Sequence, residues 1–103
     1  MYTKEEILKA FKRINWDYKI SPEEMYSILK EDANYKGTLD KDWLYMKMLQ
    51  NMRWNEIISI LLESDWFIIL GNRFIAGLFP KQRKEKYLNV RQLLLNNTIS
   101  ISR

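Results

Sequence analysis

Large apolar side chains recur every three or four residues along most of the chain, the spacing that places them on one face of a helix. Three of these runs begin directly after a residue that caps helices well: Thr3, Ser21 and Asp40. The first two are followed three residues later by a glutamate, which completes a capping box. The pattern therefore predicts helices over residues 4–14 and 22–31 and a third helix after Asp40.

The stretch Trp43–Leu62 is the longest part of the chain that is dense in large apolar and aromatic residues. Its first apolar stripe ends at Met52, and continuing in the same register would bring polar residues into the core. A fresh stripe begins at Trp54. We therefore expect two helices with a break near residues 51–54. The two stripes are Leu44, Tyr45, Met48, Leu49 and Met52, then Trp54, Ile57, Ile58, Leu61 and Leu62.

Residues 66–79 fit two local structures. One is a pair of short helices hinged at Gly71-Asn72, with Ser64-Asp65 ending the preceding helix and capping the next segment. The other is a β-hairpin, in which 67–70 and 73–76 pair across a two-residue Gly-Asn turn. Helical neighbours on both sides favour the helices.

A last helix is predicted from Pro80, which suits a first helical turn, to about Asn96. Trp16, Tyr18 and Ile20 alternate with polar residues and predict an extended connector before the second helix. The predicted fold is all-α: a compact single-domain bundle of about five to six short helices over residues 1–96, with a flexible C-terminal tail over 97–103.

Composition narrows the classes of function. The apolar fraction of 47% is enough for one packed core, and the chain has neither cysteine nor histidine. Disulfides, thiolate nucleophiles and the usual neutral-pH base are therefore excluded. Paired carboxylates all lie at predicted helix starts, where acids favourably meet the helix dipole. We expect no enzyme activity, no cofactor and no metal site.

The first residues and the longest apolar run indicate where in the cell the protein is expected. The first residues lack the apolar core of a signal peptide, and the run 66–70 is far too short to cross a bilayer. The sequence therefore predicts a soluble cytoplasmic protein.

The net charge of +4 is distributed unevenly. Residues 1–65 carry −2 and residues 66–103 carry +6. This basic segment suits phosphate contacts, an acidic protein partner or a solvated helix face. A winged helix-turn-helix, with the second and third helices followed by a hairpin at 67–76, is one form of a nucleic-acid-binding regulator. Apart from the terminal Arg103, the basic residues of this segment are Arg73, Lys81, Arg83, Lys84, Lys86 and Arg91.

Aromatic residues make up 14% of the chain, a large share for so small a core. Trp43 lies off the stripe of its helix and Trp66 lies in a predicted connection. Exposed tryptophans are typical anchors of protein interfaces. These two tryptophans and the basic residues above are therefore the predicted partner-binding residues.

A series of short motifs runs over residues 14–95: Trp16-Asp17-Tyr18 with Ile20, Pro22-Glu23-Glu24, Ile28-Leu29, Leu44, Leu49, Trp54 with Glu56-Ile57, and Leu78-Phe79-Pro80 before a basic helix. These motifs are similar to those of a family of small bacterial proteins encoded beside nucleotidyltransferase-like toxins of the abortive-infection type. The resemblance implies a helical, antitoxin-like companion that binds and restrains a partner protein. It carries over no catalytic residue. A nucleic-acid-binding transcriptional regulator and a homo-oligomeric scaffold remain the alternatives.

Overall fold

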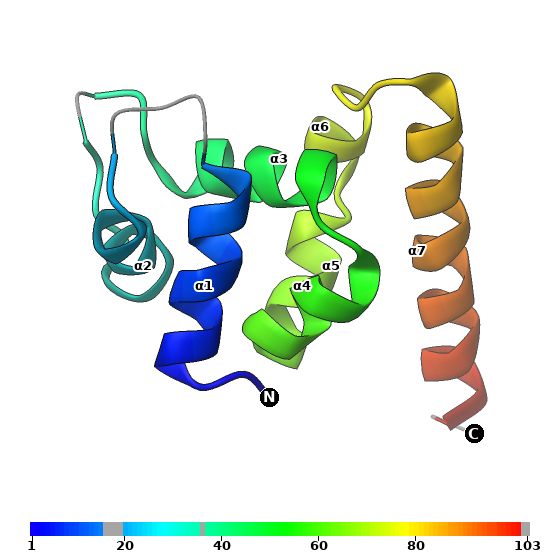
Figure 1. The fold of residues 1–103 in the computed structure, drawn as a ribbon. Helices are drawn as coiled ribbons and strands as arrows, with labels where there is room; N and C mark the ends of the chain where they lie inside the picture. The colour runs from blue at the N-terminus through cyan, green and yellow to red at the C-terminus, as the bar shows by residue number, and fades with distance from the viewer. Residues whose placement is uncertain (16–19, 36, 102–103) are drawn as a thin grey trace.

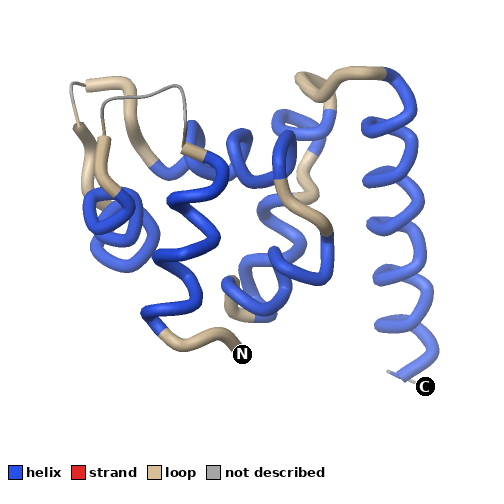
Figure 2. Tube along the Cα trace, in the orientation of Figure 1, coloured by secondary structure: helices blue, strands red, loops and turns tan. Residues whose placement is uncertain are grey.

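The computed structural model describes residues 1–15, 20–35 and 37–101, with residues 97–101 described by their backbone alone. Within these ranges the chain forms seven helices and no strand (Figures 1 and 2). The all-α prediction is therefore confirmed, and residues 67–76 adopt the helical alternative instead of the hairpin. The helices are α1 (Lys4–Ile14), α2 (Pro22–Glu31), α3 (Lys41–Asn51), α4 (Trp54–Ile60), α5 (Glu63–Ile69), α6 (Asn72–Ile75) and α7 (Lys81–Ile101).

The first three helices begin at the predicted caps. The hydroxyls of Thr3 and Ser21 accept hydrogen bonds from the backbone N–H groups of Glu6 and Glu24, at 3.2 and 3.1 Å. Both glutamates return a bond to the cap residue, so both capping boxes form. Asp40 Oδ1 accepts from the backbone N–H three residues on, at 3.0 Å. These caps satisfy donors that a helix start otherwise leaves free.

Helix α3 is the central element of the fold. It packs against α1, α2, α4 and α6, and Figure 1 shows α1 and α2 on one side of it and α4 to α6 on the other. Leu44, Met48 and Leu49 on α3 are fully buried. Tyr45 stacks edge-on against Phe74 of α6, with ring centroids 5.6 Å apart. The buried apolar residues from all parts of the chain form one core cluster around this helix.

The break predicted inside Trp43–Leu62 is present. Met52 and Arg53 have extended backbones, which end α3 and start α4 in a new direction. The second stripe was only partly correct, because α4 ends at Ile60 and Leu61 is already extended. Helical spacing therefore does not carry on to Leu62, which is 56% exposed, whereas Ile60 is fully buried.

The α4–α5 connection also differs from the expectation. The predicted cap at Ser64-Asp65 lies within the first turn of α5, because Leu62 already occupies the cap position. At the other end of α5 the predicted hinge is correct: Gly71 is extended and α6 begins at Asn72.

Helix α7 stands at the edge of the molecule (Figure 1). It begins after a cis Phe79-Pro80 peptide bond, and the Pro80 carbonyl accepts from the N–H of Arg83 at 2.9 Å. The Gln50 side-chain amide of α3 bonds both backbone groups of Phe79 and so holds the connection to α7. The radius of gyration is 14.0 Å, against about 12.8 Å for an average compact domain of this size. The position of α7 at the edge of the molecule agrees with this larger radius of gyration.

Two predictions concern the connector and the C-terminal segment. The extended connector at Trp16 and Tyr18 lies outside the described residues, while Ile20 after it is buried. The backbone of α7 stays helical as far as Ile101 instead of ending near Asn96. The flexibility of residues 97–103 stays a prediction.

Candidate functional site

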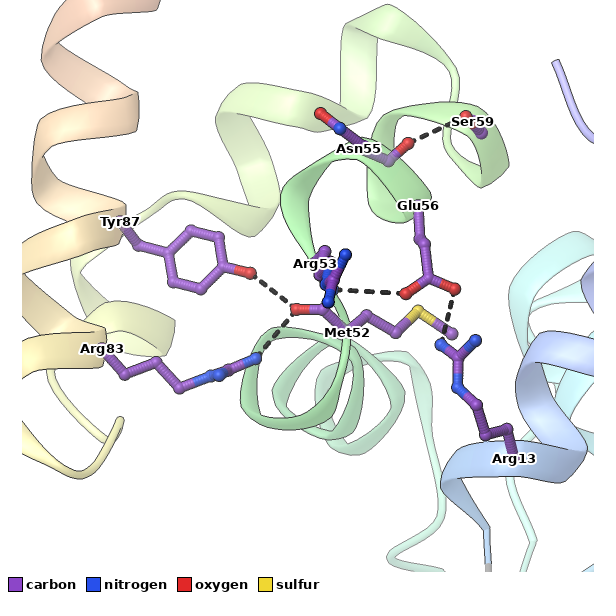
Figure 3. Close-up of polar contacts among 8 residues, drawn as sticks. All are labelled: Arg13, Met52, Arg53, Asn55, Glu56, Ser59, Arg83 and Tyr87. Carbon is purple, nitrogen blue, oxygen red and sulfur yellow. Dashed lines mark hydrogen bonds and ion pairs between the residues drawn. The ribbon is translucent and has the colours of Figure 1, made fainter.

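Helix α7 is attached to the end of α3 through backbone carbonyls (Figure 3). The Met52 carbonyl accepts from Arg83 Nη2 at 2.8 Å and from the Tyr87 hydroxyl at 2.9 Å. Arg83 Nε donates to the Leu49 carbonyl at 2.6 Å. The last carbonyls of a helix lack helical partners and carry the negative end of its dipole, so an arginine is favourable there. Burial raises the pKa of Tyr87, and the neighbouring Arg83 opposes this shift.

Aromatic rings extend this attachment between α7, α4 and α5. Tyr87 is fully buried and meets Trp54 edge-on, with ring centroids 6.3 Å apart. Trp54 meets Trp66 in the same way at 6.2 Å, and Trp66 Nε1 donates to the Leu61 carbonyl at 3.3 Å. Trp43 is half-buried and packs against the core. Both tryptophans predicted as interface anchors thus contribute to packing within the chain.

Two further arginines of the predicted set also have partners within the chain. Arg91 Nη1 donates to the Leu70 carbonyl at 3.2 Å and to Asn72 Oδ1 at 2.6 Å, which fastens α7 to the α5–α6 connection. Arg73 Nη2 lies 3.0 Å from Asp42 Oδ1 on α3, in an exposed ion pair. The positive charges of these arginines are therefore directed largely to acceptors of the same chain.

The lysines of the predicted set make few contacts within the chain. Lys81 lies 3.9 Å from Glu85 one turn on, but its side chain is 87% exposed. Lys86 is exposed, with Nζ 5.7 Å from the centre of the Tyr87 ring. Lys84 is half-buried. The three lysines thus lie along the first turns of α7. They differ from the arginines, which bond acceptors on other helices.

One face of α7 combines two of these lysines with exposed leucines. We call Lys81, Lys84, Leu88 and Leu95 the α7 outer face, since their spacing of three, four and seven residues places them on one side of a helix. Leu88 and Leu95 are large apolar residues, yet they are 37% and 40% exposed. Tyr87 and its neighbours on the inner side occupy the positions against the core instead.

Sequence reasoning missed the exposed leucines of α7 as binding candidates. The available signal was the seven-residue separation of Leu88 and Leu95, one turn beyond the lysines. Other large apolar side chains are exposed near α5, before α7 and on another side of α7: Leu62, Phe67, Ile68, Phe79 and Leu93.

Within the described part of the chain, no group of three or more acidic side chains is arranged to hold a metal ion. None of the helices described is both long enough and apolar enough to pass through a bilayer. Comparison of the chain with known proteins found no matching protein-family model, no matching curated protein and no matching solved structure.

Proposed function

We propose that this chain is a non-enzymatic protein–protein interaction module of the antitoxin type, which binds and restrains a partner protein through the α7 outer face. The observation that carries the proposal is the exposure of Leu88 and Leu95 beside Lys81 and Lys84 on a helix at the edge of the fold. Apolar side chains at helical spacing are the anchors by which a helix enters a groove on a partner. The cations beside them select the charge of that groove.

The partner surface that fits this face is an apolar groove with an acidic rim. Leu88 and Leu95 would fill the groove, while Lys81 and Lys84 meet carboxylates at its edge. Complementary charge of this kind speeds association and makes it sensitive to salt. The family resemblance suggests the partner class, a nucleotidyltransferase-like toxin, and the absence of histidine and cysteine agrees with a binding role.

Co-purification with the protein encoded by the neighbouring gene tests the proposal. We expect the two proteins to co-elute and the partner's activity to fall when they are mixed. Leu88→Asp and Leu95→Asp should each weaken binding about tenfold or more, because burying one leucine contributes about 1.5–3 kcal/mol.

Leu93→Asp is the matched control, because Leu93 is more exposed and lies on a different side of the same helix. The proposal fails if all three aspartate variants bind equally well, or if the neighbouring protein neither co-elutes nor loses activity.

A nucleic-acid-binding regulator is the second candidate, and the exposed Lys81 and Lys86 favour it. Its winged form lacks support, because residues 67–76 are helical and supply no hairpin wing. Titration with duplex DNA at two salt concentrations decides this alternative, since phosphate contacts weaken steeply as salt rises. Binding with such a slope, unaffected by Leu88→Asp, would favour DNA over the protein partner.

A further inference from the structure

A polar hollow lies between α1 and the start of α4, and no described residue of α7 lines it. Its volume is about 490 Å³, and an adjoining hollow of about 310 Å³ shares Tyr2, Arg13 and Glu56 with it. The larger volume falls within the range of small-molecule sites in proteins. The residues that line the larger hollow are Tyr2, Arg13, Asn51, Arg53, Asn55 and Glu56.

Two arginines and one carboxylate set the charge of this hollow. Figure 3 shows Arg13 and Arg53 on either side of Glu56. Arg13 Nη2 lies 2.5 Å from Glu56 Oε2, and the backbone N–H of Arg53 lies 3.5 Å from Glu56 Oε1. The guanidinium of Arg53 has no hydrogen-bond acceptor among the residues that the structure describes. One positive charge in the hollow is therefore unmatched.

The donors available there exceed what the protein itself uses. A guanidinium carries five N–H donors, and the one ion pair of Arg13 engages only a single nitrogen. Asn51 lines the hollow, and its side-chain amide nitrogen donates to the Lys47 carbonyl. Asn55 is a further polar residue in the lining of the hollow. The lining thus offers strong donors for an anion and amide groups for a polar body beside it.

We propose that this hollow binds a small phosphate ester, whose anionic oxygens bond the guanidinium of Arg53 and the unused N–H groups of Arg13. Planar guanidinium groups match phosphate oxygens in paired hydrogen bonds. A phosphate monoester has three terminal oxygens, so it can bond Arg53 and Arg13 at once. A ligand carboxylate has only two oxygens and offers fewer acceptors to the same donors. The amides of Asn51 and Asn55 and the ring of Tyr2 meet the rest of the ligand.

Chemical-shift mapping on the full chain tests this assignment, with inorganic phosphate, glucose 6-phosphate and acetate as probes at ionic strength matched with sodium chloride. We expect both phosphate probes to produce saturable shifts centred on Arg13 and residues 51–56, and the sugar phosphate to bind more tightly. Acetate should produce smaller shifts at the same concentration.

Arg53→Gln should reduce the affinity for phosphate about tenfold, the effect of losing a charge-assisted bond, and Arg53→Lys should retain part of it. Lys12→Gln is the matched control, because it removes an exposed cation of α1 that does not line the hollow. Arg53 is chosen because its side chain supports no other described residue. The proposal is overturned if shifts scatter over all cationic surfaces, if Arg53→Gln behaves as Lys12→Gln, or if no probe binds. These outcomes are independent of partner binding through the α7 outer face.

Discussion

The shared carbonyl of Met52 gives the sharpest test of how α7 is held. Two donors converge on this oxygen, the Tyr87 hydroxyl at 2.9 Å and Arg83 Nη2 at 2.8 Å. Tyr87→Phe removes the first donor and keeps the ring. Because Arg83 still satisfies the oxygen, the variant should lose only about 1 kcal/mol of unfolding free energy. For a domain of this length that loss corresponds to a fall in Tm of about 4–6 °C.

Removing both donors should cost more than the two single changes together. Arg83→Met alone should cost about 2 kcal/mol, since the arginine also serves the Leu49 carbonyl. The double variant leaves the Met52 oxygen without any side-chain donor. Its loss should exceed the sum of the single losses by about 1–3 kcal/mol, the penalty for a buried acceptor that is left unpaired.

Urea denaturation followed by far-UV circular dichroism measures all four proteins of this cycle. Tyr26→Phe is the matched control, because the Tyr26 ring is only half-buried and its hydroxyl has no hydrogen bond among the described residues. Its effect should stay within about 0.5 kcal/mol. Additive losses in the double variant, or equal losses for Tyr87→Phe and Tyr26→Phe, would refute the shared-acceptor explanation.

Three further outcomes follow from the structure. Burial raises the pKa of Tyr45 from 10.0 to about 12, with nearby carboxylates adding to the shift. Tyr45 therefore ionises at lower pH in the unfolded chain than in the folded one. Its contribution to the unfolding free energy should be complete below pH 10 and be lost between pH 10 and 12, and Tyr45→Phe should reduce this loss in alkaline denaturation. Ser21→Ala removes the α2 cap and should lower stability by about 1 kcal/mol in urea titrations, whereas an equal stability would show the cap to be idle. Arg73→Gln breaks an exposed ion pair with Asp42 and should change stability by less than about 1 kcal/mol, with any effect fading in high salt.

Local chemistry made much of the fold predictable. Thr3, Ser21 and Asp40 act through residues only three positions away, so the helix starts could be predicted from neighbouring letters. The change of apolar register after Met52 marked the α3–α4 break for a similar reason. Leu62 was misplaced because a two-residue extended turn, which has no strong sequence signature, ends α4 early.

The role of the basic segment could not be predicted in this way. Arg83 and Arg91 bond carbonyls that lie 34 and 21 residues away in the sequence. Every residue has a backbone carbonyl, so the sequence does not indicate which of them an arginine will bond. Counting charges therefore overstated the cationic surface of the C-terminal third. Only the packed structure separates the arginines that hold α7 from the lysines and leucines that it exposes.

The reliance of α7 on main-chain acceptors has a consequence for sequence divergence. Replacing the side chain of Leu49, Met52 or Leu70 leaves the oxygen that α7 binds in place, whereas the donor side cannot change without loss. The information for the attachment therefore resides almost entirely in one short pattern, an arginine, a tyrosine and an arginine spaced four residues apart at 83, 87 and 91. Distant relatives of this chain are best sought by that spacing, even where the rest of the core has drifted.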